Sequence, residues 1–167
     1  MFTGSMILSA TQPWVPSANR IPAMTSATTP SGVVTCSSEL SVNWAAWMAF
    51  NQVNTGLYNQ WLTNGTTTGW VVYDFGTGNG FIARQYTVQA SNTVDWHPRT
   101  MKTWTFEGWN GSTWDVLDTQ GPVAAWTQGL KRTYPFANAT SYEKYRWNIT
   151  ASQATDYTGA GELEIMS

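Results

Sequence analysis

The sequence predicts an all-β domain folded as an antiparallel β-sandwich or jelly roll, on three observations. From residue 32 onward, short apolar runs alternate with Gly, Asn and Pro turn signals, which is typical of consecutive strands. Helical spacing of apolar residues is confined to one short run, 44–50. Aromatic residues make up 14% of the chain, and such large side chains suit the core between two packed sheets.

The first half of the domain supplies three strands and a short helical segment. Residues 33–38 form the first apolar run and predict the first strand. The run 44–50 is short, so we expect one or two helical turns there. Residues 69–75 are almost continuously apolar and are followed by three closely spaced glycines, which predicts a strand and its end. Residues 81–90 form the next strand, with alternate apolar side chains on one face.

The second half begins with a hairpin. In the strand 102–109, Trp104 and Phe106 alternate with polar residues and are expected to point into the core. Asn110 and Gly111 then supply the two positive-φ positions of a tight turn. Four further runs complete a set of eight strands: 113–119, 130–136, 142–151 and 161–166.

Charge and composition exclude several classes of function. The chain has 8 basic and 10 acidic residues and a formal net charge of −2, so it lacks the positive surface that binds nucleic acid or an anionic membrane. No run approaches the ~20 apolar residues of a membrane-spanning helix. A single Cys and a single His leave no disulfide framework and no Cys-rich or two-His metal site. We therefore expect neither nucleic-acid binding nor membrane insertion.

Residues 1–30 differ in composition from the rest of the chain. They contain four of the seven prolines and few charges, and their apolar residues follow no clear period. Because proline fixes φ and removes a backbone donor, this segment predicts an extended N-terminal arm, with the globular domain at 31–167. We expect the arm to dock on a partner, so that a chain starting near Thr29 keeps its thermal stability.

An ordered set of sequence landmarks resembles the discoidin-like domain, also called the coagulation-factor C-type or galactose-binding-like domain. The resemblance covers residues 30–166 and implies an eight-stranded jelly roll that binds glycans with loops at one end. The landmarks are VVTCSSE (33–39), AAWMAF (45–50), GWVVYDFG (69–76), HPRTMKTWTFEGWNGSTWDVLDT (97–119), YEKYRWNITA (142–151) and GELEI (161–165).

A second resemblance concerns the joint between the arm and the domain. The segment IPAMTSATTPSGVV (21–34) is similar to the entry of such domains in bacteriophage tail and virion proteins. This resemblance implies a virion protein that is assembled in the host cytoplasm and acts outside the cell. It also implies several copies per particle.

One loop concentrates the side chains that suit a sugar ligand. The loop 91–100 contains Trp96, His97 and Arg99. A sugar presents an apolar CH face and a ring of hydroxyls, so an aromatic ring can stack on the face while polar side chains bond the hydroxyls. For Arg99 the resemblance implies a structural Pro-Arg feature, which we favour. For Trp96 and His97, ligand contact and a structural role stay open.

Two further loops contribute candidates. Tyr157 matches by position the aromatic residue that glycan-binding relatives of this resemblance carry before the last strand. The early loop offers Tyr58 and Asn59, whereas the resemblance implies that Trp61 belongs to the core. By resemblance, the three candidate loops share one end of the sandwich: 54–61, 91–100 and 152–160.

The resemblance also implies a structural calcium ion. The positions that match are Asn51, Thr55 and Glu162, and calcium prefers carboxylate and carbonyl oxygens. The loop of such relatives opens with Asp-Gly, whereas this one opens with Asn51-Gln52, so the site has one carboxylate fewer.

Catalysis has weaker support. Glycoside hydrolysis needs two carboxyl groups a few ångströms apart. Glu107, Glu162 and Glu164 occupy strand positions that are expected on solvated faces. Asp95 and Asp156 lie in loops, and nothing in the sequence pairs them. We therefore expect no enzyme.

The expected function is reversible attachment of a phage virion, near its tail, to bacterial surface polysaccharide. The alternative is a purely structural virion protein in the tail or head. In that case the arm docks to other virion proteins and the sandwich binds no ligand. Binding of host polysaccharide separates the two.

Overall fold

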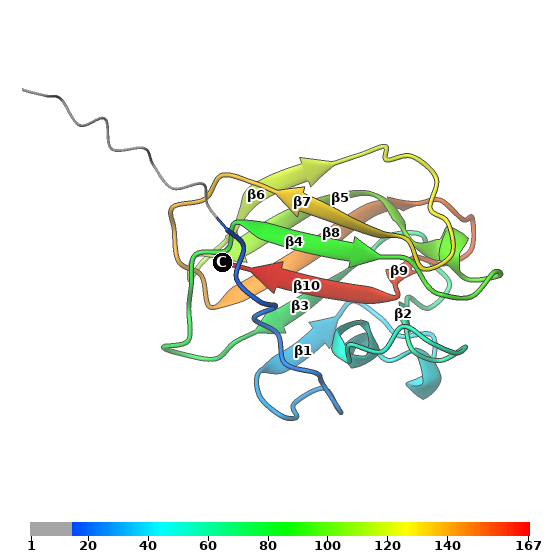
Figure 1. Ribbon diagram of the computed structural model, residues 1–167, viewed down its shortest axis with the longest axis horizontal. Coiled ribbons are helices and arrows are strands. Elements are labelled where there is room, and N and C mark those ends of the chain that lie inside the picture. Colours follow the sequence, from blue (N-terminus) through cyan, green and yellow to red (C-terminus); the bar gives the residue numbers. More distant parts are fainter. Residues whose placement is uncertain (1–14) are drawn as a thin grey trace, which may run out of the picture.

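The computed structural model describes residues 15–167, which fold into a two-layered sandwich (Figure 1). Strands that are neighbours within each sheet are antiparallel, which confirms the all-β sandwich. The five-stranded sheet has the order β1 (Val33–Cys36), β3 (Gly69–Asp74), β8 (Lys144–Ser152), β5 (Met101–Trp109) and β6 (Trp114–Gln120). The three-stranded sheet has the order β10 (Glu162–Met166), β4 (Gln85–Gln89) and β7 (Lys131–Pro135).

All eight expected strands are present, and the sequence reasoning missed only short elements. The missed strands are β2 (Trp61–Leu62) and β9 (Gly159–Ala160), which pair with each other. The expected helical turns are two 3₁₀ segments, η1 (Val42–Trp44) and η2 (Ala46–Phe50), and a third, η3 (His97–Arg99), lies in the loop before β5. Among the described residues, no helix is long and apolar enough to cross a membrane.

The hairpin between β5 and β6 forms as expected, but its turn differs. Gly111 has a positive φ of 100°, whereas Asn110 does not have a positive φ. Instead, the Asn110 side-chain oxygen accepts the backbone N–H groups of Ser112 and Thr113 at 3.0 and 2.9 Å. The turn therefore spans residues 110–113 and is closed by an asparagine side chain, because a capping side chain replaces the second positive-φ residue.

The core between the sheets is aromatic. Phe106 of β5 stacks on Tyr86 of β4, with ring centroids 4.3 Å apart, and on Tyr145 of β8 at 5.5 Å. Trp104 is also buried and donates its indole N–H to the Tyr86 hydroxyl at 2.9 Å. The predicted inward positions of β5, Trp104 and Phe106, are therefore confirmed. Trp61 is fully buried, as expected.

The segment before β1 belongs to the domain, which contradicts the predicted boundary at residue 30. Ile21 is 0% exposed, and Met24 is buried in the same core cluster. The Arg20 N–H donates to the Ile165 carbonyl at 2.8 Å, and the Met24 N–H donates to the Phe50 carbonyl at 3.0 Å. Proline forbids a regular strand here but does not forbid packing. The part of the predicted arm at 1–14 lies outside the described residues.

Candidate ligand-binding site

The three candidate loops meet at one end of the sandwich, opposite the C-terminus (Figure 1). The Asn92 N–H donates to the Asn54 side-chain oxygen at 3.0 Å, which joins the second loop to the first. Arg99 forms an ion pair with Asp156, which joins the second loop to the third. The expectation that these loops share one end is confirmed.

Aromatic side chains from three separate segments touch at this end. Trp44 of η1 packs edge-on against Tyr58, with ring centroids 5.2 Å apart. It also packs against Trp96 at 5.4 Å with an interplanar angle of 34°. Tyr58 is 47% exposed, so the cluster reaches the surface. Within the described chain, the buried Trp44 Nε1–H has no hydrogen-bond acceptor.

Arg99 organises the other side of the cluster. Its guanidinium carbon lies 4.4 Å from the centroid of the Trp96 ring and 5.6 Å from that of Tyr157. Its Nε and Nη2 atoms donate to Asp156 Oδ2 at 3.0 and 2.6 Å, and Nη1 donates to the Asp95 carbonyl. Arg99 thus joins the second loop to the third, and its guanidinium also lies against two candidate stacking rings.

The ion pair sets the charge state of Asp156. Burial by itself raises the pKa of Asp156, but hydrogen bonds from Arg99 and from the Tyr157 N–H outweigh it, and the net pKa is lowered. Asp156 is therefore ionised at neutral pH. A general acid in glycoside hydrolysis needs a raised pKa instead.

The remaining two candidates are tied to their own loops. The His97 Nδ1 atom lies 3.3 Å from the Thr93 carbonyl oxygen, which orients the ring. The Asn59 side-chain oxygen accepts a hydrogen bond from the Asn51 side-chain N–H at 3.2 Å, and the Asn59 side-chain N–H donates to the Thr55 carbonyl. Asn59 therefore closes the loop 51–59, whereas His97 lies next to Trp96 and keeps one ring nitrogen without a partner among the described residues.

A separate group of oxygens lies beneath the first loop. Glu162 of β10 is 4% exposed, and its Oε1 accepts the Val53 N–H at 2.9 Å. The Asn51 side-chain oxygen accepts the same N–H at 2.8 Å, so these two oxygens are neighbours. Glu162 Oε2 is buried and has no hydrogen-bond partner among the described residues. Thr55, the third expected calcium ligand, is exposed, and its carbonyl accepts a hydrogen bond from the Asn59 side chain.

The Glu162 carboxylate is costly to ionise where it lies. Burial raises its pKa from 4.5 to about 8, although the N–H groups of Val53 and Gln52 partly offset the effect. A bound cation would remove this cost because it would compensate the negative charge. Glu162 and Asn51 therefore fit a calcium site in part.

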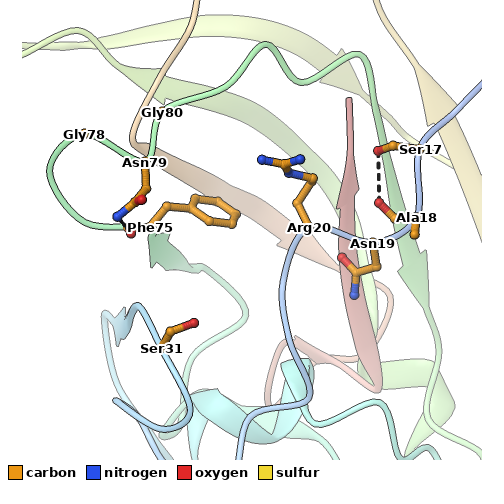
Figure 2. Close-up of a pocket in the computed structure, with 9 residues that line it drawn as sticks. All are labelled: Ser17, Ala18, Asn19, Arg20, Ser31, Phe75, Gly78, Asn79 and Gly80. Atoms are coloured by element: carbon orange, nitrogen blue, oxygen red, sulfur yellow. Dashed lines mark hydrogen bonds between the residues drawn. The ribbon is translucent and has the colours of Figure 1, made fainter.

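An open hollow lies at the other end of the sandwich, lined in part by residues 17–20 and 78–80. It has a volume of about 700 Å³ and is open to solvent. Figure 2 shows Arg20 and Phe75 facing into it, beside the turn that contains Asn79. The Arg20 guanidinium lies 4.7 Å from the Phe81 ring centroid.

No family model and no curated protein matches this chain. Solved structures do match. Chitosan-binding module 1 of a chitosanase/glucanase from Paenibacillus sp. IK-5 has a TM-score of 0.63 and 16% identity, and the match covers 81% of this chain and 95% of the module. A family 32 carbohydrate-binding module from Clostridium perfringens, in complex with GalNAc-β-1,3-galactose, has a TM-score of 0.65, 14% identity and coverage of 81% and 95%.

A third solved structure is another family 32 carbohydrate-binding module from Clostridium perfringens, in complex with galactose. Its TM-score is 0.63 at 12% identity, and the match covers 81% of this chain and 93% of that module. The chain has the galactose-binding-like fold. This confirms the discoidin-like fold that the sequence landmarks implied.

In this galactose-binding-like sandwich, sequence reasoning missed Trp44. Its helical spacing with Trp47 and Met48 pointed only to a short helix. Structurally, Trp44 is the ring that joins Tyr58 to Trp96. The surrounding letters SVNWAAW (41–47) contain no signal for this role, because the role depends on two distant loops.

Two carboxylates expected on solvated faces are buried in the galactose-binding-like sandwich. Glu107 of β5 is 3% exposed and forms an ion pair with Arg146 of β8, and Glu162 lies under the first loop. Alternation along a strand predicts which face a side chain occupies. Whether that face is covered depends on other segments of the chain. The prediction that Glu107 and Glu162 lie on solvated faces was therefore wrong.

Proposed function

We propose that this chain is a non-enzymatic glycan-binding module whose loop cluster takes a sugar unit. One observation carries the proposal. The Arg99 guanidinium contacts the rings of both Trp96 and Tyr157 at the loop end of the sandwich. Rings that are held by such contacts lose little conformational freedom when a ligand stacks on them. His97 and the Arg99–Asp156 pair add directed hydrogen bonds beside the rings.

The matching solved structures support the ligand class. They include a module in complex with galactose and another in complex with GalNAc-β-1,3-galactose. The carboxylates support a binding role over hydrolysis, because Asp156 is ion-paired to Arg99 and Glu107 is ion-paired to Arg146. Neither pair leaves a protonated acid opposite a free base.

Titration calorimetry with galactose and with host surface polysaccharide tests the proposal. We expect a sub-millimolar dissociation constant for the parent, about 4–6 kcal/mol, since one or two stacked rings form a small interface. Trp96→Ala and Tyr157→Ala should abolish binding while the protein stays folded, and Trp96→Ala should also lower the melting temperature because it removes contacts with Trp44 and Arg99. Val94→Ala is the matched control, because Val94 is an exposed apolar residue of the same loop. Equal binding by all four proteins would exclude this end as the ligand site.

The biological setting that we propose is a phage virion that attaches near its tail to bacterial surface polysaccharide. The likeness of residues 21–34 to virion-protein joints supports this setting. Weak single sites would act through several copies per particle. Virions that adsorb to host cells without any binding of the purified chain to polysaccharide would favour the structural alternative.

We also propose that Glu162 and Asn51 take part in a calcium site. The buried Glu162 Oε2, which has no partner among the described residues, supports it. An ion that binds only the folded state raises the melting temperature as its concentration rises. We expect this response to calcium in the parent and not in Glu162→Gln. A melting curve that is equal in chelator and in millimolar calcium would remove the ion.

A further inference from the structure

The outer face of the five-stranded sheet carries a groove that is separate from the loop cluster. It has a volume of about 250 Å³, and its lining is mostly apolar. Val72 of β3 lies opposite Thr35 of β1 on one side and opposite Arg146 of β8 on the other. Two half-buried tryptophans, Trp70 and Trp114, also line the groove.

The groove is held rigid from below. The Arg146 guanidinium carbon lies 4.3 Å from the Trp114 ring centroid, and Trp109 packs on the same ring at 5.3 Å. Arg146 is itself fixed by the buried Glu107, which also accepts hydrogen bonds from the side chains of Thr105 and Asn148. Trp114 is therefore ordered before any ligand arrives, which lowers the entropic cost of stacking on it.

The charges in the groove are balanced. Arg146 is paired with Glu107, and Lys144 is paired with Asp74 at 2.8 Å. The surface therefore offers hydrogen-bonding groups without a net charge that would select an ionic partner. Apolar rings combined with neutralised polar groups match a neutral sugar chain, whose rings have CH faces and peripheral hydroxyls.

A second hollow borders the groove at Lys144. It has a volume of about 690 Å³ and contains Trp109 and the hairpin turn at Asn110. Trp70 lies on β3, whereas Trp114 and its register partner Trp109 lie at the hairpin end of β5 and β6, so aromatic rings occupy two places along this face. Rings at two places suit a polymer better than a single sugar unit, because different units of one chain can contact different rings.

We propose that this face is a second glycan site, which binds an extended, neutral β-1,4-linked chain along Trp70, Trp114 and Trp109. Equatorial linkages make such a chain a flat ribbon with apolar faces, and a flat ribbon fits a groove on a sheet. The site shares the ligand class of the proposed function but none of its residues, so either site can fail alone.

The test titrates the full chain with N-acetylchitohexaose and, separately, with galactose. We expect Trp114→Ala and Trp70→Ala to weaken hexaose binding at least about tenfold, or about 1.4 kcal/mol, and to leave galactose binding unchanged. Thr35→Arg fills the groove from an exposed edge-strand position, so it should block the hexaose without touching the core. Val116→Ala, on the same face at an exposed position of β6, is the matched control.

Three results would overturn the proposal. The first is a parent protein that does not bind the hexaose. The second is hexaose binding that survives Thr35→Arg and Trp114→Ala, or that is lost only with Trp96→Ala at the loop end. The third is a ligand-free dimer in sedimentation that Thr35→Arg converts to monomers, since a second copy would then occupy the face. Loss of galactose binding in Trp96→Ala, with hexaose binding retained, would support both sites independently.

Discussion

Replacing Ile21 and Met24 with Ala tests whether the segment before β1 is part of the folding unit. Both side chains are buried in the main core cluster, and the Tyr73 hydroxyl lies 3.6 Å from the Met24 sulfur. Truncating a buried Ile or Met to Ala costs about 2–5 kcal/mol of stability. The variant loses the free energy gained by moving the deleted apolar groups out of water, and a cavity remains. The double variant should therefore lose on the order of 4–10 kcal/mol if the two sites add.

That loss is comparable to the whole stability of a typical domain, about 5–15 kcal/mol. We accordingly expect a chain that starts at Thr29 to be unfolded or close to it, contrary to the expectation from sequence. Urea unfolding followed by tryptophan fluorescence measures the change, with Val15→Ala and Val42→Ala as controls at exposed positions. A double variant whose free energy of unfolding stays within about 0.5 kcal/mol of the parent would refute the packing argument.

Three further predictions concern single side chains. In chelator, the parent should lose stability as the pH rises from 4.5 toward 8, because the folded state holds the Glu162 proton more tightly than the unfolded chain, and Glu162→Gln should flatten this part of the pH profile in thermal melts. Trp104→Ala should cost about 3–5 kcal/mol in urea unfolding. Arg146→Ala should cost about 3–5 kcal/mol, since it leaves Glu107 buried without its partner, and Glu107→Gln in the same background should recover part of the loss.

The strands and their inward faces could be predicted because they depend on the sequence of neighbouring residues. Successive side chains of a strand point to opposite faces, so the alternation around Trp104 and Phe106 already determined which of them enter the core. The landmarks that resemble galactose-binding-like domains added the placement of three loops at one end. Tyr58, Trp96 and Tyr157 could therefore be proposed from the sequence.

The sequence by itself determined the fold class and the positions of the eight main strands along the chain, because periodicity and turn chemistry are encoded over a few neighbouring positions. Only the tertiary structure decided that Ile21 is core, that Trp44 joins two loops, and that Glu107 and Glu162 are buried. Each of these facts depends on what covers a side chain. The covering segment comes from a distant part of the chain, so the pattern of neighbouring residues cannot predict it.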